Sequence, residues 1–139
     1  MKILIDDARP RRVERALAVF PLLGVTTNPT ILRAAEPSDF ASDLARLRGL
    51  VGERDLHVQV VARDTDRMLR EARAIRRIAG ERTLVKIPTT AAGLPAITAL
   101  KAQGARVTAT AVYSTAQGLL AAAARTDYLA PYINRISNA

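Results

Sequence analysis

Short apolar runs alternate with amphipathic helical patterns along the whole of this 139-residue chain. Strands are expected over residues 2–6, 24–27, 55–62, 83–87, 106–112 and 128–133, and helices over 10–20, 40–51, 68–79, 94–103 and 114–123. In the helical segments apolar residues recur at three- and four-residue spacing, as in Met68, Ala72, Ile75 and Ala79. Six consecutive strand–helix units predict a parallel β-sheet covered by helices, which is an α/β fold.

Two architectures fit this alternation: an open doubly wound sheet and a closed (β/α)8 TIM barrel. The first turn, Asp6 to Pro10, contains no glycine, and the chain has neither GxGxxG nor a P-loop, which disfavours a nucleotide-binding open sheet. A barrel has eight strands and about 250 residues. We therefore expect residues 1–139 to form a single incomplete TIM-barrel domain of about six units. The chain would be a truncated product, a proteolytic fragment or the ordered portion of a longer chain.

Composition excludes several classes of site. The chain has no cysteine, which rules out disulfides and thiolate metal sites, and its one histidine, His57, disfavours a histidine-built metal site or a Ser/His/Asp triad. We expect His57 to be a core residue, deeper in the sheet than the strand ends. No run of about 18 apolar residues and no signal peptide is present, so we expect no membrane span and a cytoplasmic location.

Charge points to a phosphate-bearing partner. The net charge is +8, and 18 of the 21 basic residues are arginine. A basic surface attracts phosphate on nucleic acid or on a small metabolite. Aromatic residues make up 4% of the chain and tryptophan is absent, which is poor equipment for stacking on bases. We therefore expect a small-molecule partner and no nucleic acid.

Lys86 is the most informative residue of the sequence. It lies inside the otherwise uncharged strand Leu84–Pro88, and both faces of a parallel sheet are covered. Burial of an ammonium group favours its neutral form, and a neutral amine can form a Schiff base with a carbonyl substrate. On this segment alone, a lysine that extends from the strand end to a surface ion pair is the favoured alternative.

Two separate motifs then resemble one family. The segment GVTTNPTIL at Gly24–Leu32 resembles the signature of the transaldolase family, and LVKIPTTAAGL at Leu84–Leu94 resembles its Schiff-base lysine motif. The similarity continues through 110–113, 116–118 and 130–136, so it covers nearly the whole chain. The resemblance is greatest to the fructose-6-phosphate aldolase branch. It implies a (β/α)8 enzyme that needs neither a metal nor a cofactor and that assembles into decamers built from rings.

The resemblance implies a role for each matching residue of the reaction centre. Lys86 would form the imine with the ketose or dihydroxyacetone carbonyl. Gln59, Thr110 and Tyr132 would hold a catalytic water, with Tyr132 as the proton-transfer group. Asp6 would be the carboxylate near the sugar hydroxyls, with an acid–base or orienting role.

The remaining matches concern substrate binding and the choice of branch. Thr26 and Asn28 would bind hydroxyl groups beside the lysine, and Arg135 would bind phosphate. A glutamine at 59 and a tyrosine at 132 favour the aldolase branch, because the larger transaldolases carry glutamate and phenylalanine there. The implied reaction is the reversible cleavage of fructose 6-phosphate, or a related sugar phosphate, to dihydroxyacetone and glyceraldehyde 3-phosphate. The alternatives are a transaldolase, which transfers the dihydroxyacetone unit, and an inactive fragment or basic binding module.

The sequence departs from the family pattern at two places. Asp6 is followed by Asp7, where the family usually has threonine, and this second acid could change the charge near the sugar site or point to solvent. Strands seven and eight, including a second phosphate contact on strand seven, are not found in the 139 residues.

Overall fold

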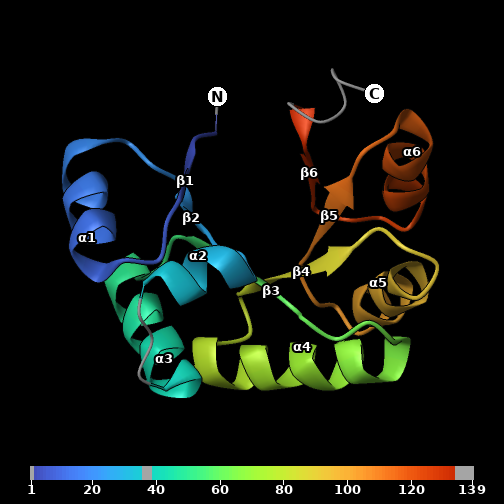
Figure 1. Cartoon of the computed structure of the whole chain (residues 1–139), viewed down its shortest axis with the longest axis horizontal. Coiled ribbons are helices and arrows are strands. Elements are labelled where there is room, and N and C mark those ends of the chain that lie inside the picture. Colours follow the sequence, from blue (N-terminus) through green and yellow to red (C-terminus); the bar gives the residue numbers. More distant parts are fainter. Residues whose placement is uncertain (1, 36–38, 134–139) are drawn as a thin grey trace. The chain divides into compact units, whose positions relative to one another are not determined.

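The computed structural model describes residues 2–35 and 39–133, which fall into two compact units. One unit contains the described residues of Met1–Gln59 and Ile75–Thr83, and the other contains those of Val60–Ala74 and Leu84–Ala139. Both units are built from parallel strands that alternate with helices, as the sequence predicts (Figure 1).

The first unit holds the first three strands. Its elements are β1 (Leu4–Asp6), α1 (Pro10–Val19), β2 (Gly24–Thr26), α2 (Pro29–Ala34), α3 (Phe40–Val51) and β3 (Asp55–Gln59). β1 pairs with β2 and β2 with β3, both in parallel. Fully buried Val13, Val25, Leu44 and Leu56 come from α1, β2, α3 and β3 and form its core. The hydrophobic effect of burying these faces holds the helices against the strands.

Gly24, in the first family-like motif, is required by this packing. A Cβ atom added to Gly24 would lie 1.9 Å from the carbonyl oxygen of Asp55 on β3. Only glycine lets the two backbones approach so closely.

The second unit holds the last three strands. Its elements are β4 (Leu84–Pro88), α5 (Gly93–Ala102), β5 (Val107–Val112), α6 (Thr115–Ala123) and β6 (Tyr128–Pro131), and it also contains the first ten residues of α4 (Thr65–Ala79). β4, β5 and β6 pair in parallel in that order. α5 packs on β4 and β5, and α6 packs on β5 and β6 (Figure 1).

Most predicted elements are confirmed, with shifts at their ends. The apolar stripe of α4 is buried, and Gly80 and Gly104 follow their helices at φ values of +85° and +73°. Ser114 caps α6 as predicted, because its side chain accepts a hydrogen bond from the N–H of Gln117. The third strand ends at Gln59 rather than at residue 62, and α2 was not predicted.

Three leucines of α6 and β6 are exposed. Leu119 and Leu120 on α6 are 67% and 52% exposed, and Leu129 on β6 is 46% exposed. Among the described residues, no helix is long and apolar enough to cross a membrane.

Candidate functional site

Lys86 is buried at the centre of β4. Its residue is 6% exposed, and the four neighbours Leu84, Val85, Ile87 and Pro88 contribute no charge. Its carbonyl accepts a hydrogen bond from the N–H of Val60 (3.2 Å). The prediction that this lysine is withdrawn from water is therefore confirmed.

Hydroxyl groups line the strand next to the lysine. Thr108 on β5 is in register with Lys86, and Thr110 is in register with Pro88 at the strand end. Because side chains alternate along a strand, Lys86, Thr108 and Thr110 face the same side of the sheet. Both threonines are buried. A buried amine beside buried hydroxyls can bind a small polar substrate.

Thr89, directly after the lysine strand, is a candidate that the sequence reasoning did not single out. Its N–H donates to the carbonyl of Thr110 (2.8 Å), and the residue is 3% exposed. Within the described part of the chain its buried Oγ1 has no hydrogen-bond partner. Buried polar atoms are almost always paired, so this oxygen is a candidate contact for a bound water or substrate. Its place in the Lys86 motif was the only signal in the sequence.

Two tyrosines lie together beyond the ends of β5 and β6. The rings of Tyr113 and Tyr132 stack with centroids 5.3 Å apart and an interplanar angle of 11°. The N–H of Tyr132 donates to the carbonyl of Val112, so the residue that directly follows β6 is held against the end of β5. Tyr132, the predicted proton-transfer group, is thus held next to a second, partly exposed phenol.

In the first unit, three polar side chains form one row across the strands. Asp6 is in register with Thr26, and Thr26 is in register with His57. Residues in register on parallel strands face the same side, so the three share one face. His57 is buried, as predicted, but it lies level with the ends of β1 and β2 rather than deeper. β3 therefore extends two residues further, to Gln59.

Gln59 ends β3, and Asn28 lies two residues beyond the end of β2. The Asn28 Oδ1 accepts a hydrogen bond from the N–H of Ile31 (2.9 Å) and so caps α2. Its amide nitrogen is the part that could still donate to a substrate hydroxyl. Gln59 is half-buried, and its Oε1 has no partner among residues 2–35 and 39–133. An unpaired amide oxygen is suited to hold water.

Asp7, the departure from the family pattern, has a local structural role. Its buried carboxylate accepts hydrogen bonds from the backbone N–H groups of Ala8 (2.8 Å) and Arg9 (2.9 Å), and it pairs with the Arg9 guanidinium at 2.6 Å. The hydrogen bond from the Arg9 side chain lowers the pKa of Asp7, although burial opposes the shift. The second acid therefore orders the entry to α1. The side chain therefore neither points to solvent nor acts through the charge near the sugar site, which were the two outcomes predicted from the sequence.

The seven described predicted site residues are divided between the units. Asp6, Thr26, Asn28 and Gln59 belong to the first, and Lys86, Thr110 and Tyr132 belong to the second. Arg135, the predicted phosphate ligand, lies outside the described residues.

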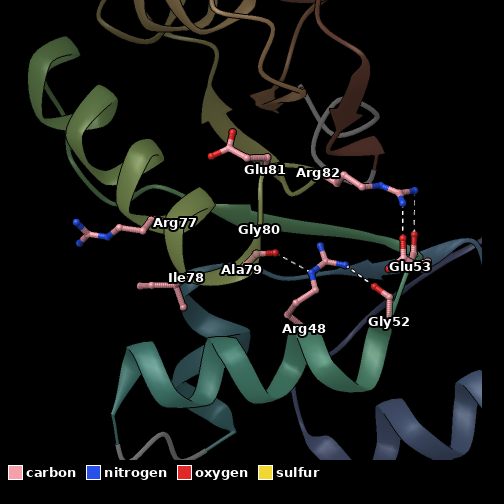
Figure 2. A pocket seen from close by; sticks show the side chains of 9 residues that line it. All are labelled: Arg48, Gly52, Glu53, Arg77, Ile78, Ala79, Gly80, Glu81 and Arg82. Atoms are coloured by element: carbon pink, nitrogen blue, oxygen red, sulfur yellow. Dashed lines mark hydrogen bonds and ion pairs between the residues drawn. The ribbon is translucent and has the colours of Figure 1, made fainter.

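A pocket of about 410 Å³ in the first unit is separate from these residues. It is lined by Arg48, Gly52, Glu53, Arg77, Ile78, Ala79, Gly80, Glu81 and Arg82 (Figure 2). Its loops precede β3 and β4, whereas active sites of parallel α/β folds lie where strands end. None of the predicted site residues lines it.

Arg48 explains why this pocket is ordered. Its guanidinium donates to the carbonyls of Ala79, Gly52 and Arg54, each at 2.9 Å, and to the Thr83 hydroxyl at 3.1 Å (Figure 2 shows the first two bonds). Burial lowers the pKa of Arg48, and the nearby charge of Glu53 opposes the shift. The pocket is therefore a structural junction in which Arg48 joins α3 to the end of α4.

Comparisons with known proteins identify the family of this chain. A sequence model described as "Transaldolase/Fructose-6-phosphate aldolase" matches residues 3–139. The chain is 42% identical over 139 residues to a "Probable fructose-6-phosphate aldolase" from Streptococcus pneumoniae (strain ATCC 700669 / Spain 23F-1). The match covers 99% of this chain and 63% of the relative, so the chain spans less than two thirds of that protein's length. Because the family match extends over almost every residue, the chain belongs to the transaldolase/fructose-6-phosphate aldolase family.

Proposed function

We propose that this chain carries the Schiff-base centre of a class I aldolase that acts on a sugar phosphate. The observation that supports the proposal is the buried amine of Lys86, in register with Thr108 on a strand without other charges. Family membership adds that the fold is a TIM barrel, of which the described residues supply six strands and the helices between them. The proposed reaction is the reversible cleavage of fructose 6-phosphate, or a related sugar phosphate, to dihydroxyacetone and glyceraldehyde 3-phosphate.

In the proposed mechanism, the neutral Lys86 amine attacks the C2 carbonyl of the ketose. The carbinolamine takes up a proton and loses water to give a protonated imine, and this proton is returned when the imine is hydrolysed. Removal of the C4 hydroxyl proton then breaks the C3–C4 bond, and the bonding electron pair moves into the imine to give an enamine. The aldehyde leaves, the enamine takes a proton at C3, and water hydrolyses the imine to release dihydroxyacetone and the free amine.

The other predicted residues would assist these proton transfers and bind the sugar. Tyr132 would move the proton at C4 or C3, with Gln59 and Thr110 holding the water involved. Gln59 is half-buried, Thr110 is buried, and Tyr132 is exposed at the strand ends. Asp6 would orient the sugar hydroxyls or act as an acid–base group.

Thr26 and Asn28 would bind the sugar hydroxyl groups, and Arg135 would bind the phosphate. The proposal further includes a homo-oligomer in the cytoplasm, with neither metal nor cofactor required. A transaldolase with the same lysine is the second candidate. The glutamine at 59, the tyrosine at 132 and the name of the S. pneumoniae relative favour the aldolase.

Borohydride trapping tests the central step. The chain is incubated with dihydroxyacetone, reduced and digested, and the adduct is located by mass spectrometry. The chain has only three lysines, Lys2, Lys86 and Lys101, so the assignment is simple. We expect a stable adduct on Lys86 that is absent in Lys86→Arg and retained in the matched control Lys101→Arg. A folded chain without an adduct on Lys86 would refute the aldolase and support a binding module.

A product assay separates the two enzymatic candidates. An aldolase releases free dihydroxyacetone from fructose 6-phosphate without a second sugar. A transaldolase needs an acceptor aldose for turnover. Turnover that depends on the acceptor would therefore replace the aldolase proposal by the transaldolase.

A further inference from the structure

β5 contains a bulge next to the proposed site. Ala109 is in register with Leu129, but Val112 is in register with Pro131, so β5 has one more residue than β6 over this interval. Ala111 takes up the extra residue with a φ of +54°, a left-handed conformation that is uncommon outside glycine. Bulges of this kind redirect side chains beside active sites. Here the bulge lies directly after Thr110.

The Gln117 side chain bonds the bulge residue Ala111 and also Tyr113, the residue that follows β5. The Gln117 Oε1 accepts a hydrogen bond from the N–H of Tyr113 (2.8 Å), and its Nε2 donates to the carbonyl of Ala111 (3.4 Å). The same Nε2 donates to the carbonyl of Thr89 (3.0 Å), after β4. An amide nitrogen has two hydrogens, so both donations are possible together. We call Gln117 and these three backbone groups the Gln117 clamp.

We propose that Gln117 is a positioning residue, which sets the ends of β4 and β5 relative to each other around the Lys86 amine. This inference rests on the proposed function for its catalytic consequence, although its structural part does not. The clamp fixes the backbone of three residues: Thr89, Ala111 and Tyr113. Ala111 is the bulge residue that directly follows Thr110. Because the Tyr113 ring stacks on Tyr132, Gln117 also controls the place of the proposed proton-transfer group.

Helix capping alone does not account for this geometry. Ser114 and Gln117 have the spacing of a capping box, in which glutamine and glutamate serve equally as acceptors. The Gln117 Oε1 accepts from the N–H of Tyr113, one residue before the N-cap Ser114. Its Nε2 group, however, points to two strand ends and makes bonds that a cap does not require. Replacement of the amide by a carboxylate therefore separates the two roles.

The test is the variant Gln117→Glu, which keeps an acceptor for the Tyr113 N–H and loses both donations. At neutral pH the glutamate carboxylate can only accept hydrogen bonds, so it has no proton to donate to the carbonyl oxygens of Thr89 and Ala111. The matched control is Gln103→Glu, at an exposed glutamine after α5 with no side-chain role in the described bonds. Gln117→Leu is a second variant without added charge. Far-ultraviolet circular dichroism and a cooperative melt verify folding.

Two structural measurements are independent of activity. We expect amide exchange at the Thr89 N–H, which donates to Thr110, to accelerate by roughly tenfold or more in Gln117→Glu, the factor expected for loss of about one net hydrogen bond. We also expect the near-ultraviolet circular dichroism of the three tyrosines to change, because the stack loosens. A folded Gln117→Glu with the exchange rate and tyrosine signal of Gln103→Glu would overturn the proposal.

Kinetics test the catalytic consequence. If the clamp positions the proton-transfer group, Gln117→Glu retains the borohydride adduct on Lys86 while kcat for release of dihydroxyacetone falls by about 10- to 100-fold, which is part of a full general acid–base contribution of about 100- to 10,000-fold. An unchanged kcat in a folded variant would refute the positioning role. Failure of the unaltered chain to form any adduct would instead refute the proposed function, and the exchange measurement would still decide the clamp.

Discussion

Replacement of Arg48 by methionine tests the junction at the end of α4. Methionine keeps much of the aliphatic length but removes all four donated hydrogen bonds. The bonds to the carbonyls of Gly52 and Arg54 are exposed and add little. The bonds to the Ala79 carbonyl and the buried Thr83 hydroxyl are part-buried, and a charged donor contributes about 1.5–3 kcal/mol to such a bond. Because Thr83 itself bonds Ala79 at 2.7 Å, part of the loss is compensated.

We therefore expect Arg48→Met to lower the free energy of unfolding by about 2–4 kcal/mol. For a domain of this size the melting temperature then falls by roughly 10 °C. The assay is thermal and urea unfolding at neutral pH, with Arg46→Met as the control because Arg46 is an exposed arginine on the same helix. A difference below about 1 kcal/mol between the two variants would refute the reasoning that Arg48 joins the helices.

Two further predictions concern backbone crowding and acid stability. Gly93→Ala should be strongly destabilising in urea unfolding, since its Cβ would lie 1.8 Å from the Pro88 carbonyl oxygen, whereas Gly49→Ala in α3 meets nothing within 4 Å and should be neutral or stabilising. Equal stabilities of these variants would contradict the close approach. The hydrogen bond from Arg9 lowers the pKa of Asp7 in the folded chain below the value of 3.8 expected in the unfolded chain. The stability that this carboxylate contributes is therefore fully present above pH 3.8 and is lost as the pH falls through the lower pKa of the folded state. Asp7→Asn should therefore lose less stability than the unaltered chain between about pH 6 and about pH 3, and an unchanged acid dependence would exclude this role.

The alternation of short, mostly apolar runs with helical patterns was sufficient to predict the six strands, although several of them contain buried polar residues. It failed at α2, which is six residues long and buries no side chain. The pattern Asn28-Pro29 nevertheless contains a start signal, since asparagine is a favoured N-cap and proline a favoured first residue. The third strand was predicted three residues too long because Val60 and Val61 continue the apolar run, although Val61 is exposed.

The candidate site residues were predicted from the family-like motifs, but their local partners were not. The roles of Asp7 and Gln117 depend on bonds to backbone groups, which side-chain patterns do not encode. The bulge at Ala111 is equally invisible, because alanine gives no sign of a left-handed conformation. In each case the missing information is the direction of a peptide group, which becomes available only with the fold.

The exposed leucines of α6 and β6 have a consequence for how this chain behaves in solution. Apolar side chains left in water gain free energy when another surface covers them. Leu119, Leu120 and Leu129 therefore favour self-association as protein concentration rises. We therefore expect melting temperatures to depend on protein concentration, so that variants are best compared at matched dilution.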